Sequence, residues 1–113
     1  MNPFQKGFIE GIIPPKPMTV SEWSDKNRRL SSKGSSEPGV WRTSRTPYLK
    51  EPMDCLSVTN TDVQRVVMMF GAQTGKSESG INFLLYTNDH CPAPILCVNP
   101  SLDMTKSMSR QML

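Results

Sequence analysis

The sequence has few of the residues from which a protein builds a large core. Hydrophobic residues make up 36% of its 113 residues and aromatic residues only 7%, whereas ten prolines and seven glycines interrupt it. A chain this short forms one domain at most, and its high surface-to-volume ratio leaves little stability in reserve. The composition therefore predicts a single small domain with a modest core.

Clusters of acidic or metal-binding residues are also lacking. The ten acidic residues are scattered with no two adjacent, and the three cysteines form no C-x-x-C pair. His90 stands beside Cys91 with Cys97 nearby, but this spacing fits no zinc pattern and a fourth ligand is missing. The sequence therefore predicts reduced thiols in a cytosolic protein rather than disulfides or a zinc site.

Neither a targeting signal nor a membrane span is found in the sequence. The first apolar stretch, Met1–Ile13, is interrupted by Glu10, precedes no small-residue cleavage site and is too short to cross a bilayer. The net charge of +3 favours anionic partners only weakly and does not establish DNA binding. Four arginines could contact DNA or phosphate, but the favoured interpretation is that they are solvated surface charges: Arg28, Arg29, Arg42 and Arg45.

What the sequence does contain begins with an amphipathic segment. Phe4, Phe8 and Ile12 fall on one helical face, and Pro14 ends any helix there. This pattern predicts a short N-terminal arm over residues 1–17. Such an arm would either dock on a partner or pack on its own domain.

A second helix is predicted by a capping box. Thr19 and Glu22 have the spacing at which each side chain bonds the other residue's amide, so a helix should run from Val20 to about Leu30. Trp23 in this helix is expected to pack in the core. A polar loop follows over residues 31–39, and then an extended approach over residues 40–46.

A third helix is expected to begin at Thr46-Pro47, as an N-cap followed by proline at the first helical position. Pro52 should kink or shorten it before about residue 56. Its core-facing residues are predicted to be Leu49, Met53 and Leu56.

The second half of the chain predicts a strand–helix–strand unit. Residues 65–70 and 93–98 are short apolar runs with the length and branching of buried strands. Between them, residues 76–86 have apolar positions at helical spacing, and a last helix follows from about Pro100 toward Met112. We therefore expect an α/β fold in which two or three helices precede a partial P-loop NTPase fold with a right-handed crossover.

The stretch between the first strand and its helix has the context of a phosphate-binding loop. Backbone amides of a tight turn and the helix N-terminus can surround a polyphosphate. In that reading Lys76 reaches the β- and γ-phosphates, the Ser77 hydroxyl binds Mg²⁺, and Gly75 allows close approach. Phe70 stands where the strict G-x-x-x-x-G-K-[ST] pattern has glycine, so Gly71 would be a shifted first glycine. The predicted phosphate-binding residues are Gly71, Ala72, Gln73, Thr74, Gly75, Lys76 and Ser77.

A phosphate-binding loop alone does not hydrolyse ATP. An apolar strand that ends in an acidic residue is also needed to position Mg²⁺ and water. No such strand is found here, because Asn99-Pro100-Ser101 follows the second apolar run. We therefore expect residues 18–113 to be an incomplete ATPase domain, truncated before the acidic strand and inactive alone.

Six segments form an ordered set along the chain: residues 18–24, 37–43, 45–48, 72–78, 92–96 and 99–103. Taken in this order, they resemble the start of the lambda-like terminase large subunit family. The resemblance covers nearly the whole chain from Met18 onward, and it depends on the order and spacing of the segments together.

The resemblance implies a two-part enzyme. An N-terminal ATPase domain, using ATP and Mg²⁺, would drive double-stranded phage DNA through the portal into a capsid in the host cytoplasm, and a C-terminal nuclease domain would cut it. The resemblance also implies that Tyr48 contacts adenine and that residues 1–17 contact the small terminase subunit. Two alternatives remain open: a non-catalytic prophage remnant or protein-interaction fragment, and an unrelated small P-loop kinase.

Overall fold

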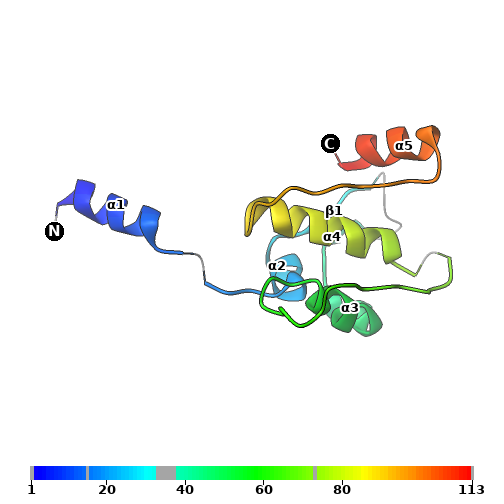
Figure 1. Cartoon of the computed structure of the whole chain (residues 1–113), viewed down its shortest axis with the longest axis horizontal. Helices are drawn as coiled ribbons and strands as arrows, with labels where there is room; N and C mark the ends of the chain where they lie inside the picture. Colours follow the sequence, from blue (N-terminus) through cyan, green and yellow to red (C-terminus); the bar gives the residue numbers. More distant parts are fainter. Residues whose placement is uncertain (1, 15, 33–37, 73, 113) are drawn as a thin grey trace.

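The computed structural model describes residues 2–14, 16–32, 38–72 and 74–112, and it combines helices with one small sheet (Figure 1). The elements in chain order are α1 (Pro3–Ile12), α2 (Val20–Asn27), β1 (Arg29–Leu30), β2 (Gly39–Val40), the 3₁₀ turns η1 (Thr43–Arg45) and η2 (Pro47–Leu49), α3 (Lys50–Cys55), α4 (Lys76–Asp89) and α5 (Leu102–Met112).

The predicted N-terminal helix forms as α1 and lies apart from the other helices (Figure 1). Its first turn has a capping box in which the Asn2 side chain accepts from the Gln5 amide at 2.7 Å. Its apolar face is left in solvent, with Phe4 80% exposed and Ile12 64% exposed. The other described residues therefore leave the apolar face of α1 uncovered.

The second predicted helix begins as expected and ends earlier. Thr19 and Glu22 form the predicted capping box, but α2 stops at Asn27. Arg28 turns the chain into an extended conformation, and β1 then pairs antiparallel with β2, Arg29 facing Val40 and Leu30 facing Gly39. This hairpin, whose tip includes residues outside the described ranges, was not predicted because its strands have only two residues each.

The core lies where α2 packs against α3 and α4. The predicted core positions Trp23, Leu49 and Met53 are buried, whereas Leu56 is only partly buried. Tyr86 packs edge-on against Trp23 and donates its hydroxyl hydrogen to the Met18 carbonyl at 2.8 Å. Burial raises the pKa of Tyr86 above its ordinary value, so the phenol stays neutral. The fully or nearly fully buried apolar cluster consists of Val20, Trp23, Trp41, Leu49, Met53 and Tyr86.

The third predicted helix is divided into a 3₁₀ turn, η2, and a short helix, α3. Pro47 is the first residue of η2, but Thr46 makes no side-chain cap. Pro52 lies in the first turn of α3, where a missing N–H costs no intrahelical bond. Proline thus sets where the α-helix can begin.

The prediction of strands at residues 65–70 and 93–98 is wrong for the described structure, and so is the strand–helix–strand unit built on them. The only paired strands among the described residues are β1 and β2. Both apolar runs are extended and follow the same direction, opposite to that of α4 (Figure 1). Val67, Met69, Leu96 and Val98 are largely exposed. Without a hydrogen-bonded neighbour, an extended apolar run does not become a strand.

Candidate phosphate-binding loop

The chain makes a tight turn before α4, as the sequence predicts. Gly75 is the N-cap of α4 and has a φ of 92°, in the left-handed region that favours glycine. A Cβ atom on Gly75 would lie 2.8 Å from Cδ1 of the buried Leu49. The turn therefore depends on glycine both for its backbone conformation and for its contact with the core.

The first turn of α4 has no side-chain cap. The Ser79 amide donates to the Gly75 carbonyl at 2.9 Å, and the Ser79 hydroxyl donates to the same carbonyl at 2.9 Å. The amides that precede Ser79 in the helix point toward the turn, as in every helix N-terminus, and the helix dipole is positive there. Lys76 and Ser77 are exposed in this first turn.

The Lys76 side chain folds across the turn. Its Nζ donates to the Phe70 carbonyl at 2.9 Å, so that the ammonium group joins both ends of residues 70–76. Inside the turn the Thr74 hydroxyl donates to the Gly71 carbonyl at 2.8 Å. A positive charge thus lies at the turn on a flexible stem that can release the carbonyl for a stronger acceptor.

Tyr48 lies against the same turn, although 26 residues separate it from its partner in sequence. Its hydroxyl donates to the Thr74 carbonyl at 2.9 Å. Its ring meets Phe70 edge-on, with ring centroids 5.9 Å apart. Half of the Tyr48 side chain remains exposed, at 51%. The residue at the position of the first Walker glycine, Phe70, therefore has a packing role in holding Tyr48 beside the loop.

Not every predicted loop residue can be placed. Gly71 and Ala72 are exposed, and Thr74 and Gly75 are partly buried. Gln73 lies outside the described residues. The structure thus brings six of the loop's seven predicted residues and the distant Tyr48 together in the described part of one turn.

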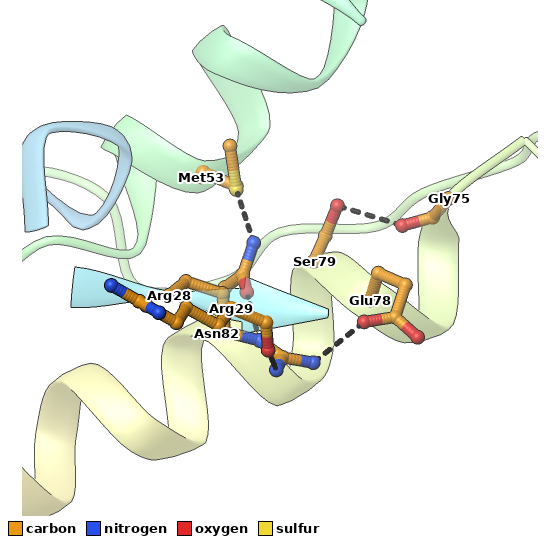
Figure 2. Close-up of polar contacts among 7 residues, drawn as sticks. All are labelled: Arg28, Arg29, Met53, Gly75, Glu78, Ser79 and Asn82. Carbon is orange, nitrogen blue, oxygen red and sulfur yellow. Dashed lines mark hydrogen bonds and ion pairs between the residues drawn. The ribbon is translucent and has the colours of Figure 1, made fainter. Parts of the chain in front are cut away.

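A network behind the turn was missed by sequence reasoning (Figure 2). Arg28 is not a solvated surface charge: its NH2 group pairs with Glu78 Oε2 at 2.7 Å, and its Nε donates to Asn82 Oδ1 at 2.9 Å. The fully buried Asn82 also donates to the Met53 sulfur at 3.7 Å. No local sequence pattern predicts this network, because its members lie on α4, on α3 and at the C-cap of α2.

A family profile described as "Phage terminase large subunit gpA, ATPase domain" matches residues 35–113. The chain belongs to this family. The match covers well over half of the chain and includes the turn, Tyr48 and α4. Searches of curated proteins and of solved structures gave no match. The expected resemblance to the terminase large subunit is thus confirmed at the level of the ATPase domain.

Membership in a terminase ATPase family implies a nucleotide, and the turn fits a polyphosphate. The evidence for the fit is the uncapped start of α4 and the Lys76 ammonium at the turn. Among the described residues no three His, Cys, Asp or Glu side chains gather as a metal site.

Within the described ranges, no helix is long and apolar enough to cross a membrane.

Proposed function

We propose that this chain is the nucleotide-binding part of a terminase packaging motor and that residues 71–77 hold the triphosphate of ATP. The observation that carries the proposal is the left-handed Gly75 at the head of α4 with the Lys76 ammonium folded over the turn. Amide donors, a helix N-terminus and a mobile cation are the parts that a phosphate-binding loop needs.

Three residues of the turn have distinct roles in this proposal. Lys76 leaves the Phe70 carbonyl and binds the β- and γ-phosphate oxygens, which are stronger acceptors because they are charged. Ser77, exposed in the first turn of α4, supplies a hydroxyl ligand for Mg²⁺. The ion would neutralise charge on the phosphates. Gly75 gives the turn its left-handed backbone and lies against Leu49, where a Cβ atom would clash.

Tyr48 is proposed to contact the adenine ring. The hydrogen bond to Thr74 and the contact with Phe70 hold its ring at the edge of the loop, with half of its surface free. An aromatic face beside a phosphate site can stack on a purine. The adenine contact and the phosphate contacts can therefore be separated by experiment.

Replacing Tyr48 with alanine is expected to weaken ATP binding about tenfold, since base stacking on an aromatic side chain contributes about 1–3 kcal/mol. Binding of inorganic triphosphate, which has no base, should stay nearly unchanged. Calorimetric titration of both ligands, with Mg²⁺ present, measures the two effects. Tyr48→Phe is the matched control, because it keeps the ring and loses only the bond to Thr74.

Two results would count against the proposal. A wild-type chain that binds neither ATP nor triphosphate would reject the nucleotide site altogether. Equal weakening of ATP and triphosphate by Tyr48→Ala would instead assign Tyr48 to loop structure rather than to the base.

In the full motor, ATP hydrolysis would be coupled to movement of double-stranded DNA through the portal into a capsid, in the host cytoplasm. An acidic strand would complete the hydrolytic centre, and an endonuclease domain would cut the DNA. In this proposal these are functions of the large terminase subunit as a whole. The family membership of residues 35–113 supports the ATPase part of this proposal, whereas the endonuclease is proposed from the resemblance alone.

A second function is favoured by the exposed face of α1. Residues 1–17 form a separate arm in our proposal, and its apolar side chains are those that a partner protein would cover. Deleting residues 1–17 should abolish capture of the small terminase subunit in a pull-down, while ATP affinity stays unchanged. Retained capture would remove the arm from the interface. Glu10→Gln, on the same helix, serves as a control for surface changes that leave the apolar face intact.

A further inference from the structure

The carboxylate of Glu78 lies in the first turn of α4, directly after Ser77. A negative charge at a helix N-terminus stabilises the helix, because it offsets the positive end of the helix dipole. A triphosphate bound at the same N-terminus would be repelled by that carboxylate. The Glu78 carboxylate therefore stabilises the start of α4 when the loop is empty. It would disfavour triphosphate binding unless its charge is neutralised.

Arg28 supplies that neutralisation. Its guanidinium pairs with Glu78 at 2.7 Å, and the side chains of Arg28 and Glu78 are only 14% and 25% exposed, so water screens the pair incompletely. Arg28 also donates to the Arg29 carbonyl and to Asn82. Figure 2 shows the guanidinium held between Glu78 and Asn82 on one side of α4, so that these bonds fix the place of the Glu78 carboxylate.

The network also ties the loop helix to the core. Asn82, one turn beyond Glu78, is fully buried and reaches the Met53 sulfur of α3. Arg28 is the C-cap of α2 and leads into β1. Arg28 thus joins the start of α4 to the end of α2 and the beginning of β1.

We infer that Arg28 is a positioning residue of the nucleotide site: it neutralises Glu78 and so permits the loop to take a highly charged polyphosphate. This inference rests on the proposed function, because it needs phosphate binding at residues 71–77. Arg28 does not touch the nucleotide, and its effect is transmitted through the carboxylate that it holds.

Four variants test the inference: Arg28→Met, Glu78→Gln, the double variant of both, and Arg29→Met. Arg28→Met should weaken ATP binding about tenfold, within the usual range for coupled sites, and weaken ADP binding less because ADP has fewer charges. Glu78→Gln should not weaken ATP binding. The double variant should recover to within about threefold of wild type, because the uncompensated carboxylate is gone. Arg29 is adjacent and exposed, and its guanidinium points away from Glu78 (Figure 2), so Arg29→Met controls for the loss of one positive charge.

Calorimetric titrations at low and high NaCl separate electrostatics from structure. The loss caused by Arg28→Met should shrink as salt rises, since salt screens the repulsion between Glu78 and phosphate. If Arg28→Met and Glu78→Gln weaken ATP equally and the double variant is no better, the pair is only structural and the inference is wrong. Thermal unfolding of each variant identifies any that fails to fold, and the double variant then decides between the two accounts.

Lys76→Ala belongs in the same titrations. If the wild-type chain binds ATP, Lys76→Ala binds it about a hundredfold more weakly and Arg28→Met matches wild type, the inference on Arg28 fails while the proposed function stands. If the wild-type chain itself binds no ATP, both fail together.

Discussion

Gly75→Ala should lower the free energy of unfolding by about 1–3 kcal/mol, from the cost of a left-handed backbone with a Cβ atom and from overpacking against Leu49. The two costs have separate origins in the structure. The φ of 92° is unfavourable for alanine wherever it occurs. The added Cβ would also lie 2.8 Å from a side chain that is itself fully buried, so Leu49 can move only by disturbing the core.

Gly80→Ala is the matched control for this change. Gly80 is in the middle of α4, and a Cβ there would meet nothing within 4 Å. Because alanine favours helix over glycine, this variant should be more stable than wild type by about 0.5–1 kcal/mol. Urea unfolding measures both. If the two alanine variants shifted the midpoint alike, the turn before α4 would not have the conformation described here.

Lys76→Ala should raise the dissociation constant for ATP about a hundredfold, since a hydrogen bond between charged groups contributes about 1.5–3 kcal/mol and Lys76 makes more than one in the proposed site. The folded state should lose little stability, because the bond from Lys76 to the Phe70 carbonyl is exposed. Binding and folding are therefore separable at this residue, unlike at Gly75.

Titration calorimetry with ATP and Mg²⁺ measures the effect of Lys76→Ala. Lys106→Ala is the control, because Lys106 is an exposed lysine on α5 whose loss changes the net charge equally. Equal ATP affinity in wild type and Lys76→Ala would contradict the assignment of the loop. If Lys76→Ala and Lys106→Ala weakened ATP binding equally, the loss of overall positive charge, and not a contact at the loop, would explain the effect.

Local signals predicted the helices because the residues that start a helix are close in sequence. The capping box at Thr19 and Glu22 and the glycine before Lys76 each set a helix start, and the structure has both. The strands predicted at residues 65–70 and 93–98 do not form, because an apolar run favours burial but supplies no neighbour to cover it, and much of both runs is exposed. A strand requires hydrogen bonds from a neighbour, and none joins these runs in the described residues.

The turn before α4 was predicted for the same reason, whereas its contacts with distant residues were not. The turn and Lys76 are contiguous, so their pattern is visible in the sequence, whereas Tyr48 was assigned only through a family resemblance. Its contact with Thr74 depends on how η2 packs against the turn. The pair of Arg28 and Glu78 crosses 50 residues, and an arginine beside another arginine gives no sign of which one will be buried. Tertiary packing decides this, and sequence patterns do not record it.

The central claim is that the amides of the turn before α4 bind the triphosphate. Backbone amide NMR spectra of the ¹⁵N-labelled chain, recorded during titration with ATP and Mg²⁺, test it most directly. Amide signals of Gly71 to Ser77 should shift most and saturate together, while those of α5 stay in place. Saturating shifts confined to residues outside the turn, or no shifts at millimolar ATP, would contradict the claim.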